Sequence, residues 1–148
     1  MARIGWMPSA VALAGAFAVA GALAVGAGVA AAARSNDDFK AATRVRSLPY
    51  EAPAIDTLTA TKEAGEPQPQ CLIGAGKDVS QSVWYRIDVD EDDAGGWDLN
   101  TAGSSYDTVM TLYRAPSRGK ARYGDLDTVA CNDDNFIGTT TSQARFFV

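Results

Sequence analysis

The chain has 148 residues, a formal net charge of −5 from 13 basic and 18 acidic residues, and no histidine. Because contacts to phosphate need clustered Lys and Arg, this balance disfavours nucleic acid as a partner. The lack of histidine excludes Ser-His-Asp and Cys-His catalysis and any His-ligated zinc or iron site. We interpret the one basic cluster as a solvated loop; it consists of Arg114, Arg118, Lys120 and Arg122.

The N-terminal third has the three-part pattern of a secretory signal. Arg3 supplies the basic start, Ala10–Ala33 carries no charge, and Ala31-Ala32-Ala33 offers the small residues that a peptidase accepts. We therefore predict a signal peptide with an apolar helix over residues 1–33, cleaved after Ala33, with Val29-Ala30-Ala31 as a second site. The alternative is an uncleaved membrane anchor, because about 20 apolar residues span a bilayer. Both interpretations export the rest of the chain and predict a secreted or membrane-anchored extracellular domain.

Residues 34–148 would then be the mature part, a length that suits one small domain. We assign residues 34–42 to a polar lead-in and residues 43–148 to the domain itself. Cys71 and Cys131 both follow the export signal. Two thiols of one small exported domain are more often bridged than free, so we predict a disulfide, with two buried thiols as the alternative.

The first extended stretches are weak. Thr43–Ser47 and Tyr50–Thr61 alternate imperfectly and are interrupted by Pro49 and Pro53. Proline removes a backbone donor, which favours edge strands over central ones. Glu63–Gln70 is a loop by composition.

The strongest strand signal begins at Ser82. Apolar and polar side chains alternate with a period of two, and the β-branched and aromatic types that favour strands are frequent. We therefore predict a strand with one face toward the core. The inward set is Val83, Tyr85, Ile87 and Val89, and the other face carries Trp84, Arg86 and Asp88.

Further short strands follow, separated by turn residues, and no helical periodicity appears outside the apolar start. Thr108–Arg114 is apolar on both faces, so we expect both to be buried. Many short strands with turns between them predict a sandwich or a barrel. The chain ends on Phe146-Phe147-Val148 without a turn or polar tail, so we expect a domain cut short at its C-terminus. The expected strands are Trp97–Thr101, Thr108–Arg114, Leu126–Cys131 and Thr141–Val148, the last with Ala144, Phe146 and Val148 on one face.

Several stretches, in order and spacing, resemble the bacterial pre-peptidase C-terminal domain family. The resemblance covers essentially all of residues 34–148. It implies an all-β, jelly-roll-like antiparallel β-sandwich, found in secreted proteins and often beside proteases, that is not itself catalytic. The stretches are Asn36-Asp37-Asp38-Phe39, Leu48-Pro49-Tyr50, Gly65-Glu66-Pro67, Ser82-Val83-Trp84-Tyr85-Arg86, Thr101-Ala102-Gly103-Ser104, Tyr106-Asp107-Thr108-Val109, Leu112-Tyr113 and Ala130-Cys131-Asn132-Asp133-Asp134.

The sequence departs from that family in two respects. The family continues past the strand at Phe146 into a turn and a Tyr-rich final strand, and that strand is absent here. The domain also directly follows the signal, with no protease domain before it. We therefore expect a non-catalytic extracellular binding or accessory domain, directed at a polymer or protein surface. The alternatives are a structural spacer of a surface protein, or part of a secreted protease whose catalytic domain lies beyond Val148.

Calcium is the metal that the sequence best suits, since it binds carboxylate, amide and carbonyl oxygens. In collagen-binding relatives of the family, calcium lies where an Asn-Asp lead-in meets an acidic loop. The matching residues are Asn36 and Asp37, with Asp78 a looser match, and Lys77 beside it weakens the transfer.

A second group of oxygen ligands follows Cys131 directly. Asn132, Asp133 and Asp134 are consecutive, and Asp107 follows a turn that could bring it near them. The group could bind calcium, or its side chains could cap backbone amides in a hydrogen-bonded loop.

A third group has the spacing of a calcium-binding EF-hand loop at Asp88, Asp90 and Asp92. It has Asp93 where that loop needs glycine and Leu99 where it needs glutamate, so we interpret it as a solvated hairpin tip. Neighbouring carboxylates in polar loops offer no dry cleft for acid-base chemistry.

Two further features concern small ligands and surfaces. Gly74–Asp78 superficially resembles a phosphate-binding loop but lacks its spacing and its Ser/Thr, so we interpret it as a flexible loop. Trp84 has polar neighbours on its own face, Ser82 and Arg86, so among the aromatic side chains it is the candidate to be partly exposed and to bind a ligand. Packing in the core or at an edge is the interpretation that we favour.

Overall fold

The computed structural model describes residues 9–14, 36–89, 95–116, 119–136 and 138–147. These residues form strands, loops and short 3-10 turns, and no α-helix occurs among them. The prediction of an all-β fold is therefore confirmed. The strands are β1 (Ser9–Ala14), β2 (Thr43–Val45), β3 (Ser82–Ile87), β4 (Gly96–Asn100), β5 (Val109–Arg114), β6 (Asp127–Asn132) and β7 (Gln143–Phe147), and the turns are η1 (Phe39–Ala41), η2 (Gln70–Leu72) and η4 (Tyr123–Asp125).

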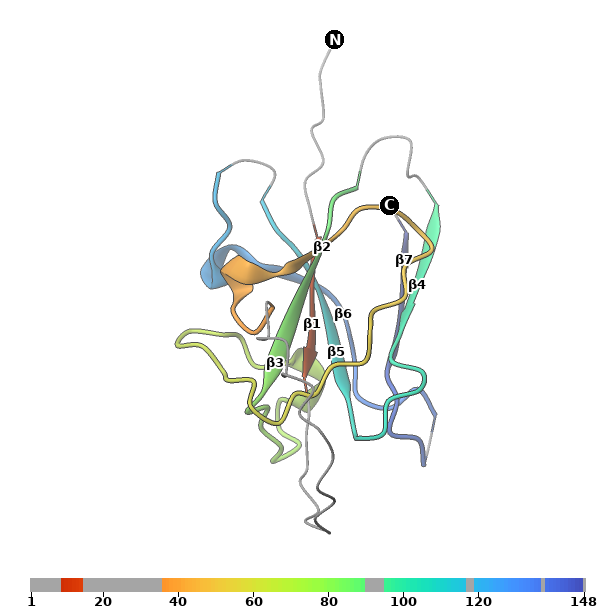
Figure 1. Ribbon diagram of the computed structural model, residues 1–148. Coiled ribbons are helices and arrows are strands. Elements are labelled where there is room, and N and C mark those ends of the chain that lie inside the picture. The colour runs from red at the N-terminus through yellow and green to blue at the C-terminus, as the bar shows by residue number, and fades with distance from the viewer. Residues whose placement is uncertain (1–8, 15–35, 90–94, 117–118, 137, 148) are drawn as a thin grey trace, which may run out of the picture.

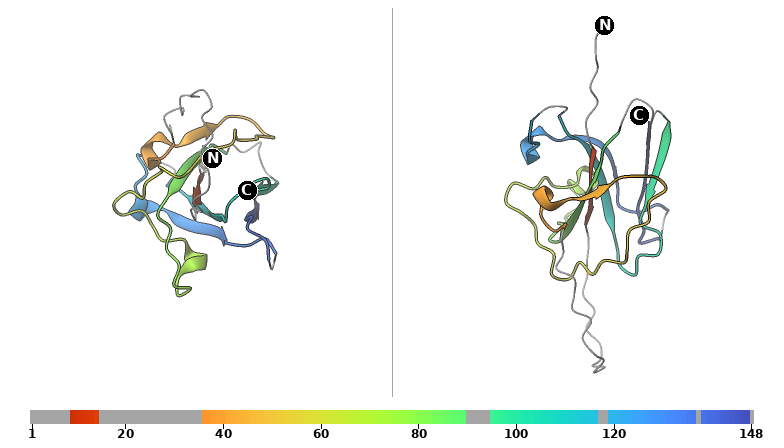
Figure 2. Two further views of the ribbon diagram at one scale, coloured as in Figure 1. Left: turned by 60° about the horizontal axis from the view of Figure 1, so that its bottom comes forward. Right: turned by 45° about the horizontal axis from the view of Figure 1, so that its top comes forward.

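The described strands lie in two sheets (Figure 1). The larger sheet has the order β2-β3-β1-β5-β6, and the smaller one pairs β4 with β7. All neighbours are antiparallel except β2 and β3, which run parallel over three residues. Figure 2 shows β4 and β7 standing beside the larger sheet from two further directions.

The strong period-two signal correctly predicted β3, and its inward side chains are buried. Val83, Tyr85 and Ile87 are at most 6 % exposed. The apolar strand β5 is buried on both faces, as its composition predicted, because five of its six residues lie in the interior. A strand that is apolar on both faces must be covered on both faces.

One core joins the two sheets. The inward side chains of β3 and β5 pack with those of β4 and β7, so the smaller sheet covers one face of the larger one. In β7, Ala144 and Phe146 point inward as predicted. The side chain of Phe147 points away from the core and is 83 % exposed. Val148 lies outside the described residues. The core members are Val45, Ala60, Val83, Tyr85, Ile87, Val89, Met110, Leu112, Ala144 and Phe146, with Ile55, Trp97, Leu99 and Ala130 at its margin.

A second, aromatic cluster covers the opposite face of the larger sheet. Trp84 and Tyr113 project from β3 and β5, and Phe39 and Tyr123 pack on them from η1 and η4. The centroid of the Trp84 ring lies 5.0 Å from that of Phe39, with the planes nearly perpendicular, an arrangement that aromatic rings favour. The polar lead-in is thus anchored on the sheet by Phe39.

The weak alternation of Tyr50–Thr61 does not produce a strand. Residues 46–54 are exposed throughout, and residues 50–57 have no regular secondary structure before the turn at residues 58–59. The prolines explain this, because Pro49 and Pro53 cannot donate to a ladder. The peptide bond between Leu48 and Pro49 is cis.

The prediction of an apolar helix at the N-terminus is wrong for Ser9–Ala14, which form β1. The physical reason is that Ser9–Ala14 have a strand on each side. Without a strand between them, β3 and β5 would have backbone groups that a helix could not pair. The rest of the predicted signal, including the cleavage site after Ala33, lies outside the described residues. Among the residues that are described, no helix has the length and apolar character needed to cross a membrane.

Candidate functional site

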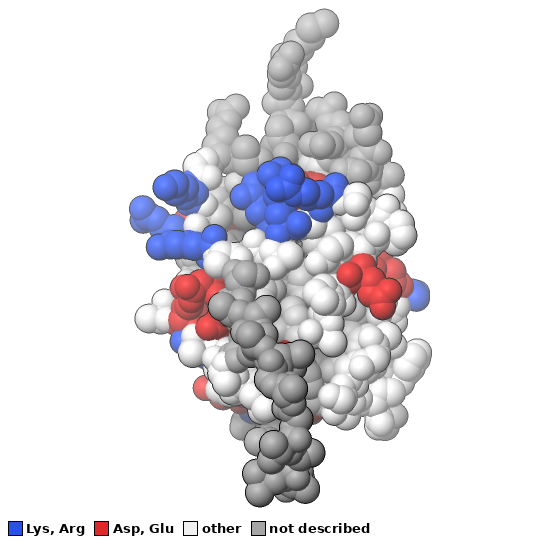
Figure 3. All heavy atoms as spheres, viewed as in Figure 1, with Lys and Arg blue, Asp and Glu red and all other residues white. Residues whose placement is uncertain are grey.

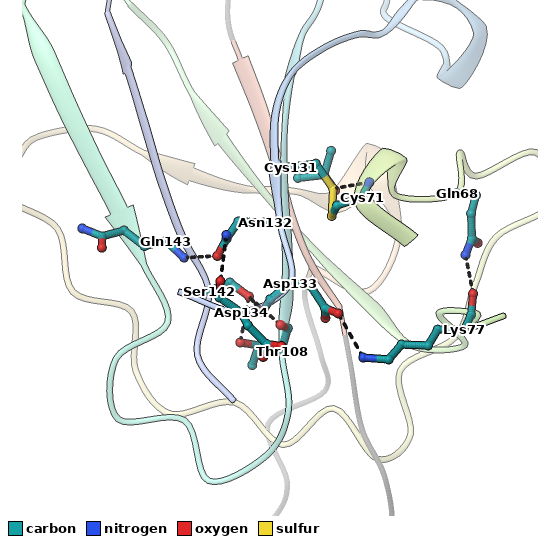
Figure 4. Close-up of a disulfide and its surroundings, with 11 residues drawn as sticks. Gln68, Cys71, Lys77, Thr108, Cys131, Asn132, Asp133, Asp134, Ser142 and Gln143 are labelled. Carbon is teal, nitrogen blue, oxygen red and sulfur yellow. Dashed lines mark hydrogen bonds and ion pairs between the residues drawn. A yellow bond between two sulfur atoms is a disulfide. The ribbon is translucent and has the colours of Figure 1, made fainter. Parts of the chain in front are cut away.

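The predicted disulfide joins Cys71 in η2 to Cys131 in β6 (Figure 4). The two Cα atoms lie 5.5 Å apart, and 60 positions separate the residues in sequence. The backbone amide of Cys71 donates a hydrogen bond to Sγ of Cys131 over 3.1 Å. The bridge therefore fixes an exposed loop to the edge strand of the larger sheet.

A small apolar cluster supports the bridge. Leu72 and Val79 from the loop pack with Val109 at the start of β5, and Cys131 contacts this group. The hydroxyl oxygen of Thr111 lies 3.3 Å from Sγ of Cys131. The loop at residues 70–79 thus has an apolar anchor as well as a covalent one.

Beside the bridge, the buried hydroxyl of Ser142 connects the ends of several strands. The hydroxyl of Ser142 donates a hydrogen bond to the carbonyl oxygen of Asp133, with the two oxygens 2.7 Å apart. The same hydroxyl lies within hydrogen-bonding distance of the carbonyl oxygen of Thr108. The amide of Ser142 donates to the hydroxyl oxygen of Thr101 at 2.8 Å, and that hydroxyl is 2.7 Å from the one of Thr108. Since Ser142 is 1 % exposed, the loss of its hydroxyl would leave buried acceptors without a donor.

Asn132 behaves as the capping alternative predicted. Its side-chain oxygen accepts from the amide of Gln143 at 2.8 Å, and its side-chain nitrogen donates to the carbonyl of Asp134 at 3.1 Å. Figure 4 shows these residues converging beside the disulfide. Asn132 thus links the end of β6 to the start of β7.

The structure brings Asp107 close to the acidic residues after Cys131, as the sequence suggested. Nζ of Lys77 lies 3.0 Å from a carboxylate oxygen of Asp133, and this hydrogen bond raises the pKa of Lys77. Burial, together with repulsion from Asp133, raises the pKa of Asp107. One oxygen of Asp107 is buried and has no hydrogen-bond partner among the described residues.

The other predicted calcium ligands have protein partners. Asn36 is buried: its side-chain nitrogen donates to the carbonyl of Trp84 at 3.2 Å, and its own carbonyl accepts from the amide of Trp84 at 2.8 Å. Asp37 accepts from the amide of Thr61 at 2.7 Å and from its hydroxyl at 3.1 Å. These contacts fasten the lead-in along β3.

Asp78 is paired with Lys62 over 2.9 Å, and the hydrogen bond from Lys62 lowers the pKa of the Asp78 carboxyl. Asp37 and Asp78 therefore contact two adjacent residues, Thr61 and Lys62, and have no protein partner in common among these contacts. In the part of the chain that the structure describes, no three Asp, Glu, Cys or His side chains gather closely enough to hold a metal ion. Carboxylate oxygens of Asp37, Asp78 and Asp133 accept hydrogen bonds or form ion pairs with protein groups, and calcium binding at these residues stays a prediction.

Of the third acidic group, Asp88 is described, and Asp90 and Asp92 lie outside the described residues. Asp88 pairs with Arg44 and, over 2.8 Å, with Arg86. The two arginines lie opposite each other in the parallel ladder between β2 and β3. On the face of the molecule drawn in Figure 3, basic side chains gather toward one end, and acidic side chains form separate patches nearer the middle.

The interpretation of Trp84 as a partly exposed, ligand-binding side chain is wrong, because its side chain is fully buried. Polar neighbours on one strand face did not indicate solvent: Ser82 is also buried, and Phe39 and Tyr123 arrive from distant parts of the sequence to cover that face. The favoured interpretation, core packing, describes Trp84 correctly. Its indole nitrogen has no hydrogen-bond partner among the described residues.

Sequence reasoning missed a pair of carboxylates, Glu63 and Glu66, beside the aromatic cluster of Trp84. Glu63 accepts from the amide of Phe39 at 2.6 Å and from the hydroxyl of Tyr123, and Glu66 accepts from the amide of Glu63 at 3.1 Å. Burial raises the pKa of Glu66, and burial with the bond to Glu63 raises that of Tyr123. The partners of Glu63 lie 24 and 60 positions away, so no local motif could have revealed them. The pair of carboxylates braces η1 and η4 over the aromatic residues.

Comparison with known proteins gave no match to a family model, to a curated protein or to a solved structure.

Proposed function

We propose that the chain is the non-catalytic binding or accessory domain of an exported protein, built as a jelly-roll-like β-sandwich of the pre-peptidase C-terminal type. Two sheets with one shared core support the sandwich. The observation that carries export is the Cys71–Cys131 bridge, because such bonds persist in oxidising compartments and are rare in the cytosol. The uncharged stretch Ala10–Ala33 points to the same route.

The chemistry of the side chains supports a non-catalytic role. The sequence has no histidine, and both cysteines are bridged, so neither an imidazole base nor a thiolate nucleophile is available. Burial raises the pKa of two described carboxyls, Asp107 and Glu66. Of these, Glu66 is held by neighbouring groups. Its carboxylate accepts from the amide of Glu63 and takes a side-chain hydrogen bond from Ser82, so its oxygens already hold the loop to β3.

The connecting segment, residues 46–59, is the surface that best suits a binding role. It contains three of the seven exposed large apolar side chains in the part of the chain that the structure describes: Leu48, Tyr50 and Leu58 are 52 %, 41 % and 56 % exposed. Figure 1 shows the segment leaving β2 without joining either sheet. Exposed apolar and aromatic side chains close together in sequence are typical of surfaces that recognise polymers or proteins.

The test is retention of the purified protein on collagen, chitin, cellulose and peptidoglycan. We expect retention on one of these surfaces. We expect Leu48→Ser with Tyr50→Ser to weaken it about thirtyfold or more, since two truncated anchor residues at about 1 kcal/mol each cost about 2 kcal/mol together. Ile73→Ser is the matched control, because Ile73 is 69 % exposed but lies outside the connecting segment.

The outcomes separate the proposal from its alternatives. Equal weakening by the control variant would point to non-specific adhesion. Failure to bind any of the four surfaces would favour a structural spacer. Hydrolysis of casein or gelatin by the purified chain would contradict the non-catalytic assignment.

A further inference from the structure

β1 occupies the centre of the larger sheet. All six of its residues have a Cα partner on β3, from Ser9 opposite Ile87 to Ala14 opposite Ser82. The same six have partners on β5, from Ser9 opposite Arg114 to Ala14 opposite Val109. We call this place between β3 and β5 the acceptor position; Figures 1 and 2 show β1 there in each view.

The acceptor position holds the larger sheet together. On their other sides, β3 pairs with the three-residue strand β2, and β5 pairs with β6. Adjacent strands lie about 4.8 Å apart, so β3 and β5, on either side of β1, lie about 10 Å from each other and cannot pair directly without moving. If β1 left, the sheet would divide into two pairs, and two buried strands would each expose a row of unpaired backbone groups.

The flanking strands restrict the chemistry of the occupant. The partners of β1 include Trp84, Tyr85, Met110 and Leu112, all buried. Opposite Val11–Leu13, where these partners lie, a charged residue would lose its hydration without a partner, whereas Ser9 and Ala10 face the exposed Arg114 and Arg86. A proline would break a ladder on one side. The segment present, SAVALA, contains neither. The position therefore suits an extended, uncharged, proline-free segment, recognised mainly through its backbone.

The occupant is also part of the segment that we propose is removed on export. Cleavage after Ala33 would cut the covalent tie between β1 and the domain and leave the two ladders alone to hold it. We infer that the acceptor position is a strand-binding site, filled in cis by Ser9–Ala14 and open, after cleavage, to an uncharged β-strand of a partner polypeptide. This inference rests on the proposed export, because a retained leader would keep the position filled.

The experiment uses the full chain with the recognition sequence of a specific protease inserted among residues 15–35. The protein is folded, cleaved and passed over a size-exclusion column. We expect the N-terminal fragment to elute with the domain, and a fluorescent peptide covering residues 7–17 in excess to displace it, followed by anisotropy. A peptide with Val11→Pro should bind about tenfold more weakly or worse, because it loses a ladder donor, whereas Val11→Ala should bind like the parent.

Three results would overturn the inference. The fragment could separate while β3 and β5 keep their protection from amide hydrogen exchange, which would show that the sheet needs no strand there. The peptide could fail to exchange, or the Val11→Pro peptide could bind as well as the parent. The polymer assay uses the uncleaved chain and different residues, Leu48 and Tyr50, so failure of one experiment leaves the other unaffected.

Discussion

Removal of the disulfide is the perturbation whose size follows most directly from the structure. Cys71→Ala with Cys131→Ala opens a covalent loop of 60 residues. In the chain-entropy account, closing a loop of that length removes roughly 4 kcal/mol of freedom from the unfolded chain. Small domains are stable by about 5–15 kcal/mol, so the double variant should lose a large part of its free energy of unfolding.

Urea denaturation followed by tryptophan fluorescence measures this loss. The midpoint should fall, and the dependence on urea should steepen, because an unfolded chain without the cross-link exposes more surface. Reduced wild-type protein is the control and should match the variant. The intact mass of the wild type should rise by about two daltons on reduction. A loss below about 1 kcal/mol with an unchanged urea dependence would refute the argument that the bridge acts on the unfolded state.

Three further predictions concern charge, the buried hydroxyl and calcium. Burial raises the pKa of Glu66 above 4.5, so the native state binds this proton more tightly than the unfolded chain does. The free energy of unfolding should therefore fall as pH rises above that value. Glu66→Gln should reduce this fall, and equal pH profiles of the free energy of unfolding for variant and wild type would contradict the prediction. Ser142→Ala should lower the free energy of unfolding by about 1–3 kcal/mol, because buried acceptors lose their donor, while the exposed control Ser80→Ala should change it by less than about 0.5 kcal/mol. Calcium at millimolar concentration should leave the melting temperature unchanged, since Asp37, Asp78 and Asp133 already bind protein groups; a rise would instead support the calcium site predicted from the sequence.

Local pattern was enough to find the strands that form the core. Alternation predicted β3 and β7, and the doubly apolar run predicted β5, because each strand is specified by which of its own side chains face inward. The two cysteines were paired from their count and from the export signal, and the structure joins them.

Contacts between distant segments could not be read in this way. Trp84 was a candidate for partial exposure because nothing on its own strand shows that η1 and η4 cover it. The hydrogen bonds of Glu63 with Phe39 and Tyr123 could not be predicted for the same reason, because these residues are distant from Glu63 in the sequence. Ser9–Ala14 were expected to be helical from their composition, whereas two neighbouring ladders decide their conformation.

Amide hydrogen exchange of the full chain tests the central claim that β1 completes the larger sheet. The structure predicts that the amides of Ser9–Ala14 exchange as slowly as those of β3 and β5, because each ladder that protects them is shared. Exchange of Ser9–Ala14 at the rate of an unfolded peptide, with β3 and β5 still protected, would contradict it.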